Sequence, residues 1–190
     1  MIGAFTKSAQ VPFYIWLPDA MEAPTPVSAY LHSATMVKAG LYLISRITPI
    51  FAISEGWVWT ITIVGLITLF WASLNATKQQ DLKGILAFST VSQLGMIMSM
   101  LGIGAVSYHY QGANSQLYVA GFVAAIFHLI NHATFKGALF MITGGIDHST
   151  GTRDVKKLGG LLTIMPISFT LTVITTLSMA GVPPFNGFLS

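Results

Sequence analysis

Twenty consecutive residues, 57–76, carry no charged side chain, and this run restricts the fold more than any other feature of the sequence. At about 1.5 Å per residue, a helix of this length spans about 30 Å, the thickness of the hydrocarbon core of a bilayer. Trp57 and Trp59 stand at one end of the run, as aromatic side chains do at a membrane interface. The run therefore predicts a membrane-spanning helix.

The overall composition extends this prediction to the whole chain. Charged residues make up 8% of the sequence, whereas a soluble domain carries about 25%. The formal net charge of +3 comes from nine Lys and Arg against six Asp and Glu, which is too sparse for a nucleic-acid surface. The absence of cysteine excludes disulfides and thiolate metal sites. We expect an integral membrane protein in contact with the lipid bilayer and without a nucleic-acid partner.

Apolar segments separated by polar connectors predict an all-α, polytopic membrane helix bundle. About six helices are expected within one transmembrane domain, 1–190, and the first and last helices are expected to be incomplete, as in an internal fragment of a longer protein. The expected segments are 1–17, 26–51, 57–76, 84–108, 116–146 and 160–190.

Prolines interrupt the first and the last of these segments. Pro12 lies inside the first, and Pro183 and Pro184 lie at the end of a break at 181–184 in the last. Paired broken helices are typical of transporters built from inverted repeats, which is the fold we expect.

The distribution of basic residues predicts the orientation. The connectors on one side of the membrane hold Lys78, Lys83, Arg153, Lys156 and Lys157, whereas the other side holds Arg46. Because cytoplasmic loops carry an excess of Lys and Arg, the first side is predicted to be cytoplasmic.

A polar stripe stands out inside the fifth segment. His128, His132 and Lys136 are spaced four residues apart, so on a helix they share one face over about 12 Å. Lys136 is followed by ten residues without charge before Asp147, which places it near the middle of the bilayer. Ionisable groups at that depth indicate a functional site.

Three further basic residues are expected at membrane depth: Lys7, His32 and Lys38. The carboxylates nearest to them lie in predicted loops. A lysine buried in an apolar environment can accept and release a proton near neutral pH, and histidine titrates in that range without perturbation. Alternating Lys and His along the helices therefore predict a proton relay.

Two other uses of the same residues stay open at this point. His128 and His132 have the spacing of helical zinc ligands, with His32 as a third ligand, although no glutamate lies between them. A membrane haem would need histidines on facing helices, and His32 and His128 could supply them. Hydrolytic motifs and phosphate-binding glycine loops are absent from the sequence.

Several longer motifs resemble the proton-translocating antiporter-like family, which includes membrane subunits of respiratory complex I and of the Mrp (Mnh) sodium/proton antiporters. The motifs are FTKSAQ at 5–10, WLPDAMEAPTPVSA at 16–29, LHSATMVKAG at 31–40, DLK at 81–83, STVSQLG at 89–95 and residues 128–136. The runs NATKQQD at 75–81 and HSTGTRD at 148–154 look more similar to the A-type Mrp subunit than to a complex I subunit.

The resemblance implies a secondary transporter rather than an enzyme, in the bacterial cytoplasmic membrane, without a cofactor. Its substrates would be protons and sodium, and its partners the other small membrane subunits of an antiporter complex. A proton-pumping subunit of complex I is the alternative. The implied relay consists of Lys7, His32, Lys38, Lys83, His128, His132 and Lys136.

Two departures from the family pattern accompany this resemblance. Tyr14 stands where many members have histidine. The glutamate partner of the Lys7 position lies on an earlier helix in the family, and a lysine usually follows the position of Ser190. We therefore expect this sequence alone not to complete a proton path.

Overall fold

The computed structural model describes residues 1–112 and 115–190, which are helical apart from their connectors. These residues form no strand, although an isolated bridge pairs Asp81 with Asp154. The expected all-α class is confirmed. The helical elements are α1 (Ile2–Lys7), α2 (Trp16–Asp19), η1 (Ala20–Glu22), α3 (Thr25–Ala29), η2 (Tyr30–Ala34), α4 (Met36–Phe51), α5 (Glu55–Lys78), α6 (Leu82–Gln111), α7 (Gln116–Thr150), α8 (Leu161–Ile164), α9 (Pro166–Met179) and η3 (Asn186–Leu189).

Among the described residues, three helices are long and apolar enough to cross a membrane: α5, α6 and α7. They cover the segments 57–76, 84–108 and 116–146 and extend a few residues beyond them, except at Gln116, where α7 begins. The Asp81 carboxylate accepts a hydrogen bond from the Gly84 N–H at 3.2 Å at the start of α6. Gly151, with φ of 66°, ends α7 in the left-handed conformation that glycine adopts without strain.

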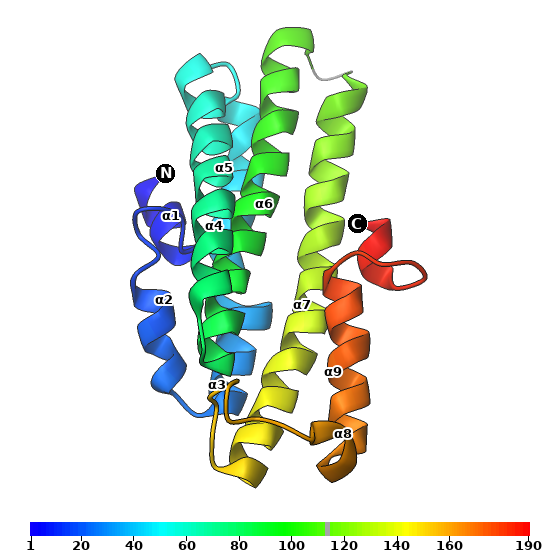
Figure 1. Ribbon diagram of the computed structural model, residues 1–190. Helices are drawn as coiled ribbons and strands as arrows, with labels where there is room; N and C mark the ends of the chain where they lie inside the picture. The colour runs from blue at the N-terminus through cyan, green and yellow to red at the C-terminus, as the bar shows by residue number, and fades with distance from the viewer. Residues whose placement is uncertain (113–114) are drawn as a thin grey trace.

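Helix α6 lies between α5 and α7, and these three helices run side by side in Figure 1. The α5–α6 contact is made by Gly65, Gly95 and Gly102, which we call the glycine interface. A Cβ on Gly65 would lie 2.6 Å from the backbone nitrogen of Ser99, and one on Gly95 would lie 2.6 Å from that of Leu69. The two backbones therefore touch, as small residues allow between membrane helices.

The segment expected as one helix at 26–51 is interrupted. It consists of α3, the π-helical turn η2, and α4, which begins after Thr35 (φ −120°, ψ −81°). The Ser33 hydroxyl donates to the Ala29 carbonyl, and the Thr35 hydroxyl donates to the Tyr30 carbonyl at 3.0 Å. Side-chain bonds of this kind compete with the regular helical ladder, and π-helical turns often occur at functional sites.

The first segment is also divided. Helix α1 ends at Lys7, residues 8–15 form turns that include Pro12, and α2 begins at Trp16. Helix α1 packs against α4.

The last segment, expected to begin as one helix at residue 160, is also divided. It contains the short helix α8, a break at Met165 and the helix α9. Met165 precedes Pro166, and a residue before proline is disfavoured in helical conformation. Helix α9 packs against α7 and ends partway along it, after which residues 180–185, with Pro183 and Pro184, lead into η3 (Figure 1).

Candidate functional site: a buried row of lysine and histidine

The stripe predicted on α7 is buried inside the helix bundle. His128 is 5% exposed, and His132 and Lys136 are fully buried. His32 and Lys38, from η2 and α4, are buried as well, at 0% and 5% exposure. We call these five residues the buried row.

Each of the two lysines in the row donates a hydrogen bond to a neighbouring helix. Lys136 Nζ donates to the hydroxyl of Ser89 on α6 at 2.5 Å and to the Leu86 carbonyl at 3.4 Å. Lys38 Nζ donates to the carbonyl of Leu129 on α7 at 2.7 Å. Because Leu129 follows His128 directly, Lys38 joins the row at the level of that histidine.

His128 connects α7 with two other elements. Its Nε2 lies 2.6 Å from Oε1 of Gln93 on α6, and its Nδ1 lies 3.1 Å from the hydroxyl of Ser190. With the amide oxygen of Gln93 as acceptor, Nε2 carries the hydrogen, and Nδ1 of the neutral ring then accepts from Ser190. A protonated ring would donate to both. His128 therefore has a partner in either protonation state.

The other two histidines have no such partners. Both ring nitrogens of His32 and of His132 are buried and make no hydrogen bond in the described part of the chain. The His32 ring lies between those of Trp16 and Phe140, with centroids 6.2 Å and 6.1 Å away. A buried polar group without a partner costs about 1–3 kcal/mol, so packing alone does not explain two such imidazoles.

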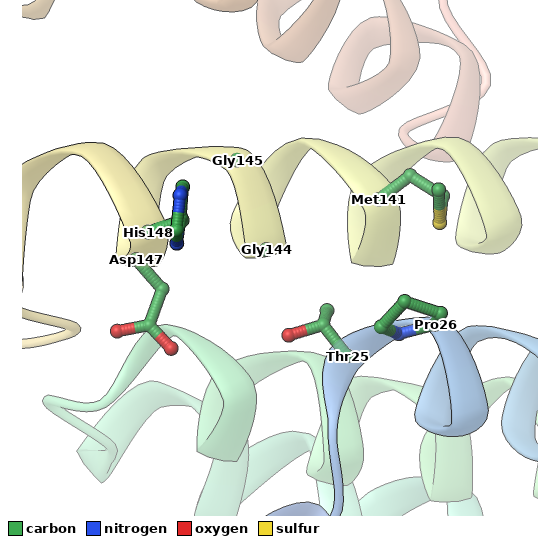
Figure 2. A pocket seen from close by; sticks show the side chains of 7 residues that line it. All are labelled: Thr25, Pro26, Met141, Gly144, Gly145, Asp147 and His148. Atoms are coloured by element: carbon green, nitrogen blue, oxygen red, sulfur yellow. The ribbon is translucent and has the colours of Figure 1, made fainter.

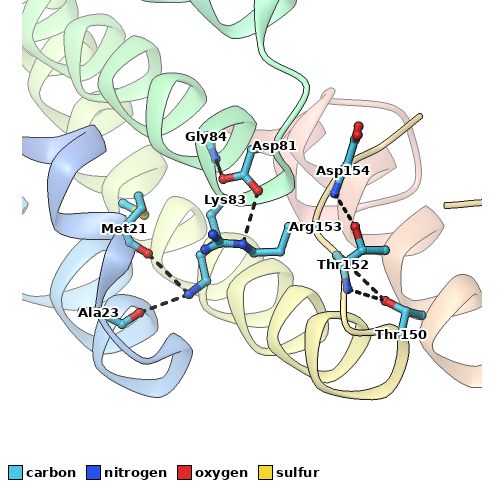
Figure 3. A network of polar contacts seen from close by, with 9 residues as sticks. All are labelled: Met21, Ala23, Asp81, Lys83, Gly84, Thr150, Thr152, Arg153 and Asp154. Atoms are coloured by element: carbon cyan, nitrogen blue, oxygen red, sulfur yellow. Dashed lines mark hydrogen bonds and ion pairs between the residues drawn. The ribbon is translucent and has the colours of Figure 1, made fainter. Parts of the chain in front are cut away.

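Lys83 is placed differently from the row, at the second position of α6. It is 3% exposed and donates to the carbonyls of Ala23 at 3.1 Å and Met21 at 3.4 Å, as Figure 3 shows. It therefore ties α6 to the connector between η1 and α3. Lys136 reaches the Leu86 carbonyl only three residues further along α6, so Lys83 lies about one turn beyond that end of the row.

Lys7 lies outside the buried row. It is the last residue of α1, its side chain is exposed, and its Nζ makes no hydrogen bond or ion pair within residues 1–112 and 115–190. The structure therefore buries six of the seven predicted relay residues, five in the row and Lys83 about one turn beyond the Lys136 end, and leaves Lys7 exposed.

Among residues 1–112 and 115–190, no carboxylate forms an ion pair with a lysine or histidine of the row. The one ion pair among the described residues joins Arg153 Nε to Asp81 Oδ1 at 3.5 Å, in the polar connectors (Figure 3). Both of its side chains are about 40% exposed, at 39% and 42%. In the described part of the chain, the hydrogen-bond partners of the row are therefore dipolar groups: carbonyls, hydroxyls and the Gln93 amide.

A pocket of about 710 Å³ lies between α3 and α7, beyond the Lys136 end of the row. The lack of a side chain at Gly144 lets α3 approach α7 closely, because a Cβ there would lie 2.8 Å from Cβ of Thr25. Asp147 and His148 supply its polar wall, as Figure 2 shows. The residues that line it are Thr25, Pro26, Met141, Gly144, Gly145, Asp147 and His148.

The geometry also bears on the zinc and haem alternatives. In the part of the chain that the structure describes, no three His, Asp or Glu side chains come close enough to hold a metal ion. Both ring nitrogens of His128 are occupied by Gln93 and Ser190, so this ring has no free nitrogen for an axial bond.

Sequence reasoning missed the polar partners of the row. Ser89 and Gln93 belong to the STVSQLG motif, and their spacing of four residues matches that of the stripe on α7. This spacing on an adjacent helix was the available signal. Asn131 on α7 forms hydrogen bonds with Asn186 in the segment after α9, and no spacing in the sequence indicated this contact.

Fold and site together define a multi-pass membrane protein whose core holds protonatable side chains. The family described as NADH:quinone oxidoreductase/Mrp antiporter, TM, matches residues 1–190. The chain belongs to this family.

Named relatives and solved structures agree with this assignment. The chain is 98% identical over all 190 residues to the A1 subunit of a Na(+)/H(+) antiporter of Staphylococcus epidermidis, of which it covers 24%. The chain thus spans about a quarter of the length of the curated relatives it matches.

The fold resembles that of the Mrp complex from Dietzia sp. DQ12-45-1b, with a TM-score of 0.86 and 45% identity over 98% of this chain and 19% of the other. A chain of the membrane-bound sulfane sulfur reductase, an archaeal respiratory membrane complex, matches with a TM-score of 0.84 and 30% identity, over 98% of this chain and 36% of that one.

Proposed function

We propose that this chain is a proton-conducting part of the A-type subunit of a multisubunit sodium/proton antiporter. The observation that carries the proposal is the buried row, in which lysines and histidines of η2, α4 and α7 are buried without an ion-pair partner in the described residues. The high identity to a subunit named for sodium/proton antiport supports the choice of transported ions.

Protons would move along the row by transfer between neighbouring basic groups. The path runs from the Lys136 end through His132 to the level of Lys38 and His128, with Lys83 and His32 beside the Lys136 end and Lys7 leading toward a neighbouring part of the protein. Two unit charges 4 Å apart interact by about 4 kcal/mol at an effective dielectric of 20. A positive charge on one lysine therefore lowers the proton affinity of the next lysine and favours release of its proton.

The pocket between α3 and α7 is where we expect protons to reach this path. Asp147 and His148 line it, so polar side chains stand at the Lys136 end of the path. The Lys and Arg residues of the nearby connectors favour a cytoplasmic position for this end.

The finer features of the fold belong to the same proposal. We expect six membrane-spanning segments, of which α1–α2 and α9–η3 are the broken pair of an inverted repeat. Their positions on opposite sides of the bundle in Figure 1 support this arrangement. The protein would act as a secondary transporter without a cofactor, in the bacterial cytoplasmic membrane, with the other small membrane subunits of its complex as partners.

A membrane subunit of a redox-driven proton pump, as in complex I, is the second candidate. The match to a chain of an archaeal respiratory membrane complex favours it, because the same fold occurs there beside a reductase. Co-purification with flavin and iron–sulfur subunits would support this candidate. Sodium tolerance that depends on the protein without such subunits would support the antiporter.

The proposal is tested by the substitution Lys136→Ala in the full-length protein, with sodium-dependent pH changes recorded in everted membrane vesicles. We expect antiport to be lost while the complex still assembles, because the path would lose the lysine at its end nearest the pocket. Lys78→Ala, at the exposed end of α5, is the matched control and should leave antiport unchanged. Wild-type antiport in Lys136→Ala would refute the relay.

A further inference from the structure

The segment that follows α9 folds back onto itself before it reaches α7. The Ser178 hydroxyl near the end of α9 donates to Oδ1 of Asn186 at 2.5 Å. Gly187 packs directly on the Ser178 carbonyl, where a Cβ would collide with the backbone. Residues 178–187 therefore form a closed loop whose shape is fixed at both ends.

Two hydrogen bonds attach this loop to α7. Asn131 Nδ2 donates to the backbone carbonyl of Asn186 at 3.1 Å, and Asn186 Nδ2 donates to Oδ1 of Asn131 at 3.2 Å. Asn131 is 5% exposed, and both ends of its amide are used. A buried amide costs free energy unless it is paired, so this match favours one specific docking of the loop.

The attachment point lies within the buried row. Asn131 is three residues after His128, about 60° away around the helix, and directly precedes His132. The single turn η3 connects Asn186 to Ser190, whose hydroxyl lies 3.1 Å from Nδ1 of His128. Fixing Asn186 on α7 therefore also fixes the distance between Ser190 and His128.

We propose that Asn131 and Asn186 are a positioning pair that holds the Ser190 hydroxyl within hydrogen-bonding distance of His128. The pair itself carries no proton. It sets the approach of a hydroxyl that accepts a hydrogen bond from the protonated His128 ring and donates one to the neutral ring, and so controls how readily His128 takes up a proton and passes it along the row. This inference rests on the proposed function, in which His128 belongs to a proton relay.

The test uses Asn131→Leu and Asn186→Leu, singly and together, in the full-length protein within its assembled complex. Antiport per assembled complex should fall about tenfold or more in each single variant, since a misplacement of about 1 Å can cost 100-fold in a transfer step. The solvent deuterium isotope effect should rise, because proton transfer becomes rate-limiting. The double variant should be no slower than the slower single one. Asn75→Leu is the control, because the Asn75 amide donates to the Trp71 carbonyl of its own helix.

The outcomes separate the two proposals. Unchanged rates and isotope effects in Asn131→Leu, or multiplied losses in the double variant, would overturn the positioning pair. A lower amount of complex with an unchanged rate per complex would show a purely structural contact, which also overturns it. If Asn131→Leu does not assemble, Asn186→Leu, at the more exposed partner, decides alone. Antiport that survives Lys136→Ala refutes the relay itself, whereas antiport lost there but unaffected by Asn131→Leu refutes only the pair.

Discussion

The two sides of α6 are built in opposite ways. Gly95 lies two residues after Gln93, about 200° around the helix, so the glycine interface and the polar partners of the row face opposite directions. On the α5 side, backbones touch through Gly65, Gly95 and Gly102. On the α7 side, the contacts run through side chains, from Ser89 to Lys136 and from Gln93 to His128.

This difference indicates that the two sides of α6 have different roles, one in packing and one in the proposed transport. Backbone contact leaves little freedom, since a single added methyl group has no space. Hydrogen bonds between side chains can break and re-form as protons arrive and leave. We therefore expect substitutions on the α5 side to change stability and those on the α7 side to change transport.

The largest effect is expected from Gly95→Ala. The new Cβ would lie 2.6 Å from the Leu69 backbone nitrogen, and overpacking of this kind costs about 1–3 kcal/mol. The thermal stability of the detergent-extracted complex should fall, with an unchanged transport rate in the complexes that remain. Gly145→Ala, where nothing lies within 4 Å of the added atom, is the control. Equal stability of the two variants would contradict the glycine interface.

The second largest effect is expected from the comparison of Ser89→Ala with Ser92→Ala, two substitutions three residues apart on α6. Ser89 accepts from Lys136, whereas the Ser92 hydroxyl lies 2.8 Å from that of Ser73 on α5. We expect Ser89→Ala to slow antiport about tenfold, because Lys136 loses its hydroxyl partner and its fixed position. Ser92→Ala should leave the rate per complex unchanged. Vesicle assays normalised to the amount of complex compare the antiport rates of the two variants. Equal rates would contradict the expected difference between the α7 side and the α5 side of α6.

A smaller effect on transport is expected from Gln93→Leu. His128 would lose the acceptor of its Nε2 hydrogen and keep Ser190, so the relay is weakened at one group and not interrupted. The rate should fall severalfold, with a loss of stability of about 1 kcal/mol for the missing hydrogen bond. Antiport kinetics and thermal unfolding of the same preparation provide both values. Abolished transport would show that Gln93 itself belongs to the relay.

Arg153→Ala should have the smallest effect, since its pair with Asp81 is exposed and such pairs contribute about 0–1 kcal/mol. Asp81→Ala should cost about 1 kcal/mol more than Arg153→Ala, because Asp81 also caps α6 through the Gly84 N–H. Thermal unfolding of the two variants measures the difference. Equal stabilities would mean that the cap contributes nothing.

The sequence indicated the long helices well because the signal is simple: lipid excludes charge, so α5 and α6 appear as long uncharged runs and α7 as an apolar segment interrupted by one lysine. The burial of Lys136 and His132 followed from the same rule. The π-helical turn at His32 and the break at Met165 were missed, because they depend on local hydroxyl bonds and on one proline.

Contacts between helices were beyond sequence reasoning for a different reason. A four-residue spacing tells which residues share a face, but not which neighbour that face meets. The Ser89–Lys136 and Gln93–His128 bonds depend on the rotation and register of α6 against α7, which many distant contacts decide together. Lys7 shows the same limit, since its exposure depends on how α1 packs on α4.

The glycine interface has one further consequence, which concerns movement. With its backbone in contact with that of α5, helix α6 cannot rotate or slide without a collision at Gly65 or Gly95. In the proposed transporter, the α5–α6 pair would therefore be a stationary frame against which other parts shift. Gating of the row would then fall to η2, with its π-helical turn, and to the loop after α9. Alternating access would be a motion of the edges around a fixed centre.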